Sequence, residues 1–249
     1  MRKSVLILGV AALALALPGC DGGGNNLAAS ANSAAPIPQI AAPNNGDWTQ
    51  IVTRTPQGTY LMGNPDAPVK LVEYASITCP HCGEFSEQGG PALRDNFVRS
   101  GQVSWEFRPY LLFPSDPGIF LMLRCLEPAA FFRASEQLYA DQRNWLARLQ
   151  QLPRDQQVAI ENLPTAQKAA AYVSAAGLDQ FFRQRGIPEA RMSQCLADEA
   201  ALRQLGEIKL RGDSEDGVTG TPTFIINGEK SDADRWSRLE PLLRTAIGG

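Results

Sequence analysis

The feature that most constrains the fold is a Cys-x-x-Cys unit that lies between a predicted strand and a predicted helix. Residues 69–75 (VKLVEYA) are β-branched and apolar, as a buried strand requires, and Thr-Cys-Pro-His-Cys follows at 78–82. Pro80 fits the first turn of a helix, because the N–H that a proline lacks would be unpaired there in any residue. We therefore expect Cys79 immediately before the first turn of that helix.

This position predicts a reactive thiol at Cys79. At a helix N-terminus, the unpaired backbone N–H groups and the positive end of the helix dipole favour a thiolate over a thiol. His81 lies in the same turn and, as a ring donor or as a cation, can stabilise the thiolate further. Cys82 lies further along the helix and is more shielded. We expect Cys79 to be the exposed nucleophile of thiol–disulfide exchange and Cys82 its resolving partner.

Two other interpretations of this unit are a zinc site and a purely structural disulfide. Two thiols and one imidazole within four consecutive residues cannot complete a tetrahedral zinc site without distant ligands. His81 is the only histidine of the chain, and there is no second Cys-x-x-Cys unit. So short a loop stabilises little as a structural disulfide. We predict that the site needs no metal and no organic cofactor.

The first residues of the chain predict export. Residues 1–19 combine basic residues with an apolar run at 5–17, which is typical of a signal peptide and too short to span a bilayer comfortably. The sequence Leu-Pro-Gly-Cys at 17–20 resembles a bacterial lipobox, in which the cysteine becomes the lipid-modified first residue of the mature chain. Lipidation of Cys20 is thus expected, with cleavage further along by the general signal peptidase as the alternative.

Residues 20–50 are dominated by Gly, Asn, Ala, Ser and Pro, which have little to pack against a core. We predict a flexible tether over this range. Together with the leader, it predicts a periplasmic domain that is anchored to a membrane through Cys20.

The composition of the whole chain indicates what class of protein it is and which partners are excluded. Hydrophobic residues make up 44% and charged residues 20%, as in a soluble globular protein. The formal net charge is −3, which argues against nucleic acid as the main partner, because phosphate binding needs clustered cations.

Cysteine counting predicts one structural disulfide. Once Cys20 is set aside for lipid, four cysteines remain, and the short loop between Cys79 and Cys82 closes easily. This leaves Cys125 and Cys195 to pair with each other across a helical region, in an exported protein where disulfides persist. The alternative is two free buried thiols.

The remaining segments predict the order of elements. The alternating apolar side chains of 103–107 indicate a half-buried strand, and 116–211 has helical spacing with several Pro and Gly breaks. A strand at 223–227 ends in Asn227-Gly228, a strong hairpin signal, and 232–247 carries one apolar helical face. The predicted order is β-α-β, a helical insertion, then β-β-α.

Two motifs together resemble the DsbA family of disulfide oxidoreductases. They are EYASITCPHC at 73–82 and GVTGTPTF at 217–224, and the resemblance covers nearly everything from residue 51 to the end. It implies an α/β fold, namely a thioredoxin fold with an all-helical domain inserted between the β-α-β and β-β-α halves. The implied boundaries are 51–115 and 212–249 for the thioredoxin-like domain and 116–211 for the helical insertion.

The resemblance also implies roles for residues outside the Cys-x-x-Cys unit. In this family the proline of the second motif is cis and faces the active-site disulfide, which implies a cis Thr221–Pro222 bond and a Thr221 backbone that pairs with an extended substrate. An ordinary trans proline is the alternative. Glu73 matches a buried acid beneath the active site, which could accept and return the proton of Cys82. The alternative for Glu73 is a solvated strand face.

By this resemblance, the chain is expected to be a thiol–disulfide oxidoreductase of the cell envelope that donates its Cys79–Cys82 disulfide to reduced or unfolded exported proteins. It implies a monomer that is reoxidised by a quinone-linked membrane protein of DsbB type. Thr221 differs from the Val of the best-known oxidases and resembles isomerases and reductases, so an enzyme kept reduced by another pathway is the alternative. A lipoprotein that binds a metal or a client without redox turnover is a more remote one.

Overall fold

The computed structural model describes residues 36–248 of the chain. The predicted signal peptide, Cys20 and residues 20–35 of the predicted tether lie outside the described residues. From residue 36 onward the chain forms one unit. Within this part of the chain, no helix is long and apolar enough to cross a membrane.

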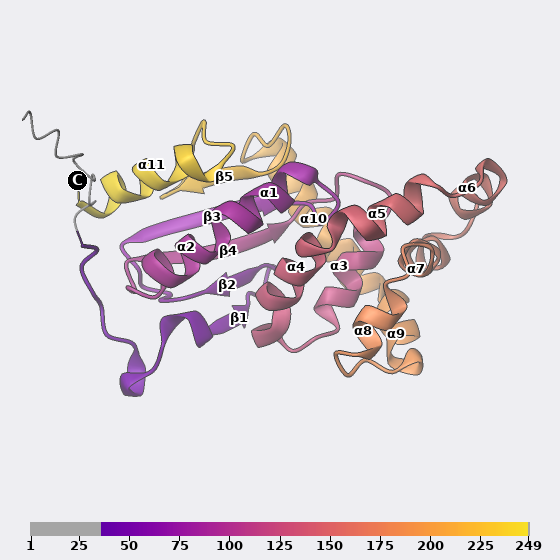
Figure 1. Cartoon of the computed structure of the whole chain (residues 1–249), viewed down its shortest axis with the longest axis horizontal. Coiled ribbons are helices and arrows are strands. Elements are labelled where there is room, and N and C mark those ends of the chain that lie inside the picture. The colour runs from indigo at the N-terminus through magenta and orange to yellow at the C-terminus, as the bar shows by residue number, and fades with distance from the viewer. Residues whose placement is uncertain (1–35, 249) are drawn as a thin grey trace, which may run out of the picture. The chain divides into compact units, whose positions relative to one another are not determined.

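The central layer of the described residues is a six-stranded mixed sheet in the order β1-β2-β4-β3-β5-β6. β4 and β3 are its two central strands; β3 is parallel to β4 and antiparallel to β5, so that Glu73 lies opposite both Phe107 and Phe224. The strands are β1 (Val52–Arg54), β2 (Tyr60–Met62), β3 (Val69–Ala75), β4 (Val103–Pro109), β5 (Thr223–Ile226) and β6 (Glu229–Lys230). The predicted order from β3 onward is confirmed (Figure 1). The hairpin of β1 and β2 was not predicted, because each strand has only three residues.

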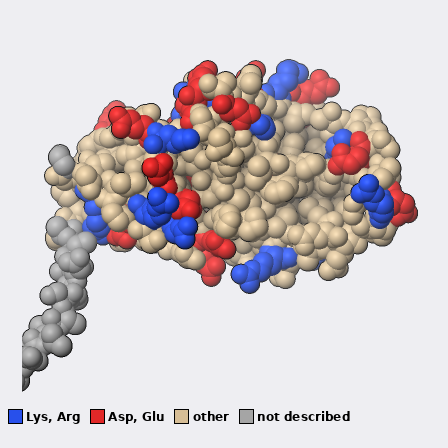
Figure 2. Space-filling view, turned by 90° about the horizontal axis from the view of Figure 1, so that it is seen from above, with Lys and Arg blue, Asp and Glu red and all other residues tan. Residues whose placement is uncertain are grey.

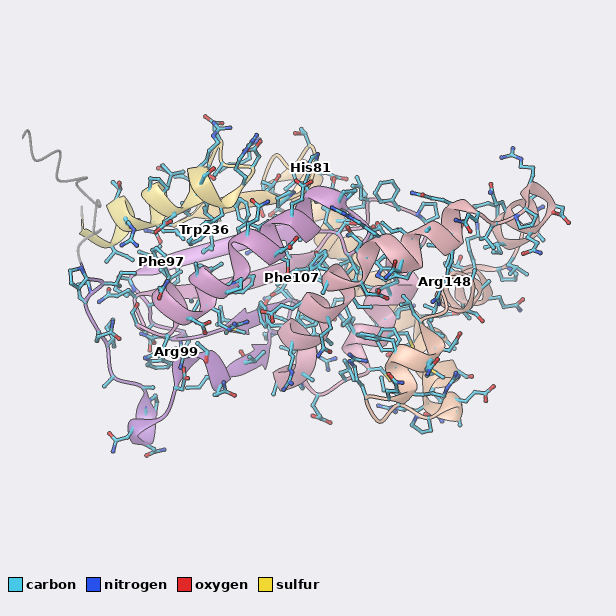
Figure 3. The ribbon with its side chains drawn as sticks, in the orientation of Figure 1. His81, Phe97, Arg99, Phe107, Arg148 and Trp236 are labelled. Atoms are coloured by element: carbon cyan, nitrogen blue, oxygen red, sulfur yellow. A yellow bond between two sulfur atoms is a disulfide. The ribbon has the colours of Figure 1, made fainter. Side chains whose placement is uncertain are left out.

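Helices outside the β4–β5 connection pack against the sheet, in part through aromatic contacts such as that of Phe85 with Phe224. They are α1 (Pro80–Gln88), α2 (Gly90–Ala92), the π-helical turn η3 (Leu93–Val98) and α11 (Trp236–Gly248). α1 ends at Gln88, and a side chain at Gly89 would meet the Trp236 side chain at 2.8 Å. The rings of Phe97 and Trp236 lie 5.6 Å apart, edge to face, and so join η3 to α11 (Figure 3).

A long helical segment lies between β4 and β5, as predicted, at the end of the sheet from which α1 starts (Figure 1). It contains α3 (Asp116–Arg124), η4 (Pro128–Ala130), α4 (Phe131–Ala140), α5 (Gln142–Gln150), α6 (Arg154–Glu161), α7 (Thr165–Ala175), α8 (Asp179–Arg183), α9 (Glu189–Leu196) and α10 (Glu199–Ser214). Phe107 of β4 contacts Phe120, Phe131 and Phe132, with ring centroids 5.1 to 6.4 Å apart. Sheet and helices therefore share one hydrophobic core. α10 continues past residue 211, and the division into two domains stays a prediction.

The prediction of a flexible tether through residue 50 is wrong for its last part. Trp48 is 7% exposed, and its indole N–H donates to the Ile40 carbonyl oxygen at 2.8 Å. The Ile40 N–H in turn donates to the Ser100 carbonyl oxygen at 2.7 Å. Burial of this large aromatic side chain, together with the ion pair between Asp47 and Arg99, holds residues 40–50 against the fold, although the segment is mainly polar.

The structure joins Cys125 and Cys195 by a disulfide, the pairing that the cysteine count predicted. It ties the residue after α3 to α9 across a sequence separation of 70 residues.

Removal of this disulfide should destabilise the fold. In the chain-entropy model a loop of this length lowers the entropy of the unfolded chain, so Cys125→Ser/Cys195→Ser should lose up to about 4 kcal/mol of unfolding free energy. Urea denaturation of the oxidised wild type and the double variant measures this difference. Equal denaturation midpoints would show that the disulfide has no such role.

Candidate active site

Cys79 is held between the end of β3 and the start of α1. It is the residue before Pro80, has an extended backbone (φ −78°, ψ 121°), and its neutral thiol donates to the Thr221 carbonyl oxygen at 3.2 Å. Cys79 is 4% exposed and Cys82 is fully buried. Both cysteines are buried, so the prediction of an exposed thiol at Cys79 is wrong, because the Cys79 sulfur lies against the Thr221 carbonyl. Both are free thiols in this structure.

Hydrogen bonds favour the thiolate at Cys79. A hydrogen bond from the Cys82 thiol is the largest influence, and it lowers the pKa of Cys79 to about 5 against the opposing effect of burial. Thr221 and the backbone N–H groups of Cys82 and His81 lower this pKa further. The Thr221 hydroxyl is buried and has no other hydrogen-bond partner among the described residues, so it is free to donate to the thiolate.

Cys82 is held in the opposite protonation state. Burial raises its pKa well above the usual range, and the hydrogen bond to Cys79 and the charges of Cys79 and Glu73 raise it further. At neutral pH the reduced pair is therefore a Cys79 thiolate beside a neutral Cys82 thiol.

Glu73 lies on β3 and is 2% exposed, so the alternative of a solvated strand face is wrong. Burial raises its pKa to about 8, although the Trp105 indole N–H donates to Oε2 at 2.8 Å and lowers it. At neutral pH Glu73 is therefore mainly a neutral acid. In its ionised form, Glu73 raises the pKa of Cys82.

The ring of His81 does not contact the Cys79 sulfur in this structure. The side chain is 73% exposed, points outward (Figure 3), and places Nδ1 3.2 Å from Glu84 Oε2 on the next turn. The predicted stabilisation of the thiolate by the imidazole is replaced by that of the His81 backbone N–H. In the first turn of a helix the backbone N–H groups point toward the N-terminal end, while the side chains point away from the helix axis.

The Thr221–Pro222 bond is cis, as the resemblance implied. It lies in the segment between α10 and β5, and the contact between Cys79 and the Thr221 carbonyl brings it to the cysteine pair. Within the described residues, no group of three or more His, Cys, Asp or Glu side chains could hold a metal ion.

The sequence analysis missed three polar residues of the helical segment that hold the residues before α1. Gln142 donates to the carbonyl oxygens of Ile77 and Cys79, at 2.7 and 2.9 Å. The Tyr139 hydroxyl donates to the Ser76 carbonyl oxygen at 3.1 Å, and Asp116 accepts from Ser76 and Thr78. No motif marks these residues, because they lie 38 to 65 residues along the chain from their partners.

A largely apolar groove adjoins this site, with a volume of about 750 Å³. Its lining includes Thr78 and Pro80, Phe113 and Pro114, and Leu146 and Leu149 of α5. Phe113 is 45% exposed, which is unusual for so large an apolar side chain. Figure 2 shows the face that is uppermost in Figure 1, where charged side chains lie around the margin and leave a wide uncharged area in the middle.

Alkylation kinetics should report the acidic thiol. We expect the rate of iodoacetamide modification of reduced protein to rise with pH through a midpoint near 5, because only the thiolate reacts and the pKa of Cys79 is about 5. Cys79→Ser is the control and should remove this phase. A midpoint of 8 or above would contradict the electrostatics of the site.

Glu73→Gln should change how stability depends on pH. The pKa of Glu73 is raised by burial to about 8, so the unfolded chain loses this proton from about pH 4.5 upward while the folded protein keeps it until about pH 8. Wild-type stability therefore falls over this window by up to about 5 kcal/mol, a loss that the neutral glutamine avoids.

Urea denaturation of wild type and Glu73→Gln at pH 4 and at pH 9 measures the effect. The unfolding free energy of Glu73→Gln relative to wild type should increase from pH 4 to pH 9. The exposed Glu87→Gln on α1 should follow wild type at both values. A constant difference between wild type and Glu73→Gln would mean that the buried acid ionises normally.

Comparisons with known proteins agree with this fold. Residues 55–244 match the family model Thioredoxin_4, described as thioredoxin. A solved structure described as a protein-disulfide isomerase from Novosphingobium aromaticivorans is 28% identical, with a TM-score of 0.74 over 77% of this chain and 98% of that one. Wolbachia pipientis alpha-DsbA1 is 18% identical, with a TM-score of 0.60 over 76% of this chain and 90% of that one.

A Rickettsia prowazekii protein, named provisionally as a protein-disulfide oxidoreductase, is 22% identical over 74% of this chain. The chain spans 60% of the length of that relative. Because the family model covers most of the chain, and the fold and the Cys-x-x-Cys turn agree with it, this protein belongs to the thioredoxin family.

Proposed function

We propose that this protein is a thiol–disulfide oxidoreductase of DsbA type, which donates its Cys79–Cys82 disulfide to reduced exported proteins. The observation that carries the proposal is the difference between the two thiols: the pKa of Cys79 is lowered to about 5 and that of Cys82 is raised. A stabilised thiolate favours the reduced pair, and the disulfide is therefore a better oxidant. The family and the folds of its DsbA relatives support the same reaction class.

The reaction proceeds in two exchanges. A substrate thiolate attacks Cys79 Sγ, the bond between Cys79 and Cys82 breaks, and Cys82 takes a proton, for which we propose Glu73 as the donor. A second substrate thiolate then attacks the substrate sulfur of the mixed disulfide and displaces Cys79 as a thiolate. Two electrons pass from the substrate thiols to the protein, and Glu73 regains a proton released by those thiols.

The cellular setting is part of the same proposal. Lipid on Cys20 would hold the protein at a membrane facing the periplasm, and residues 20–35 would give it reach. Such an oxidase needs an acceptor for the electrons it collects, and a quinone-linked membrane protein of DsbB type would serve as its reoxidant. We propose that the enzyme acts as a monomer and needs no cofactor.

A disulfide isomerase or reductase is the second candidate. It is favoured by Thr221 before the cis proline and by the likeness to the Novosphingobium structure, which is described as a protein-disulfide isomerase. Such an enzyme would be kept reduced by another pathway.

The reduction potential of the Cys79–Cys82 pair distinguishes the two. Lowering a thiol pKa from 9.0 to about 5 stabilises the reduced form at pH 7 by about 2.7 kcal/mol, or on the order of 60 mV. We expect equilibration with glutathione to give a potential well above the roughly −270 mV of thioredoxin. The Cys82→Ser variant, which cannot form the disulfide, is the control. A potential at or below that of thioredoxin would favour the reductase.

A further inference from the structure

Asp116 is a buried carboxylate that the reaction described above does not use. It is fully buried in the first turn of α3, the first helix of the helical segment. Among the described residues no Lys or Arg forms an ion pair with it, and burial raises its pKa to about 6. An unpaired buried charge is costly unless hydrogen bonds compensate it. The hydrogen-bond donors around Asp116 therefore identify the segments that it holds in place.

Its two oxygens accept from two separate segments. Oδ1 accepts from the Thr78 hydroxyl at 2.9 Å and from the Thr78 backbone N–H at 3.3 Å, immediately before Cys79. Oδ2 accepts from the backbone N–H groups of Leu112 and Phe113, at 2.8 and 2.9 Å. The Ser76 hydroxyl lies within 3.0 Å of both oxygens.

The same two segments both contribute to the groove lining. Thr78 and Pro80 enclose Cys79 in sequence and line the groove, and Phe113 lines it from the segment between β4 and α3. We call residues 112–115 the rim. One carboxylate thus joins the turn that carries the nucleophile to the rim of the groove beside it.

We propose that Asp116 is a positioning residue that couples the rim to the Cys79 turn, so that a polypeptide substrate resting on Phe113 orients Cys79 for disulfide exchange. The proposal rests on the proposed function and deepens it, because it assigns the rim to the recognition of apolar side chains near a substrate cysteine. A carboxylate suits this role better than an amide. In either orientation of an asparagine, the NH₂ group would face backbone N–H donors of one segment.

The Cys79 turn has independent support, which separates coupling from simple stability. Gln142 and Tyr139 hold the carbonyl oxygens of Ser76, Ile77 and Cys79 without Asp116. Loss of Asp116 should therefore leave the turn in place but free the rim from it. A small thiol that does not reach the rim should then react almost normally.

A double-mutant cycle between Asp116→Asn and Phe113→Ala tests the coupling. The probe is a reduced peptide with two cysteines flanked by leucine, and glutathione serves as the small thiol. We expect each single variant to lower kcat/KM for the peptide by about 10-fold, and the double variant by about 10-fold as well instead of about 100-fold, because coupled residues are not additive. Exchange with glutathione should change by less than about 3-fold in all three variants.

The matched control is Ile119→Val, which alters a fully buried side chain of the same helix and should keep wild-type exchange with both thiols. If Asp116→Asn does not fold, Thr78→Val replaces it in the cycle, because it removes one donor to the carboxylate and keeps the side-chain volume.

Three results would overturn the coupling. The double variant could lose about 100-fold in kcat/KM for the peptide, Asp116→Asn could slow exchange with peptide and glutathione equally, or Asp116→Asn could leave the peptide kinetics unchanged. Wild-type protein that exchanges with neither thiol would instead contradict the proposed function, and the coupling with it.

Discussion

The structure of the site depends on keeping one negative charge at the N-terminus of α1 and excluding a second one. Hydrogen bonds from Cys82, Thr221 and the first backbone N–H groups of α1 stabilise the Cys79 thiolate. Cys82 and Glu73 lie in fully buried surroundings, which disfavour their charged forms. Hydrogen bonds at Cys79 and burial at Cys82 therefore give the two thiols of one helical turn different protonation states.

The helical segment contributes to this arrangement as much as the sheet does. The sheet and α1 supply the two thiols, but residues 76–79 between them belong to neither element, and their backbone offers groups for further hydrogen bonds. Asp116 of α3, Tyr139 of α4 and Gln142 of α5 bind these groups. Because Phe107 packs against Phe120 and Phe131 of the same helices, one hydrophobic core fixes both the sheet and the residues that support the Cys79 turn.

Sequence patterns predicted those elements whose formation depends on neighbouring residues alone. The strand at 69–75, the start of α1 at Pro80 and the helical segment after β4 follow from side-chain alternation, proline placement and helical spacing. The outward turn of the His81 ring, the packing of Trp48 and the hydrogen bonds of Gln142 do not, since each depends on a partner that only the folded chain brings near. The burial of Glu73 was predicted through resemblance to a family, not through its own position in the strand.

The protonation states of the site also set the proton balance of the proposed reaction. Between about pH 5 and pH 8, reduction of the disulfide leaves Cys79 as a thiolate and Cys82 as a thiol, so the protein takes up two electrons but only one proton. Glu73 stays protonated over this range and does not change the count. Two ordinary substrate thiols, with pKa values of about 8.5, release two protons when they are oxidised. Oxidation of a substrate therefore releases one net proton, and it becomes more favourable by about 30 mV for each unit of rising pH.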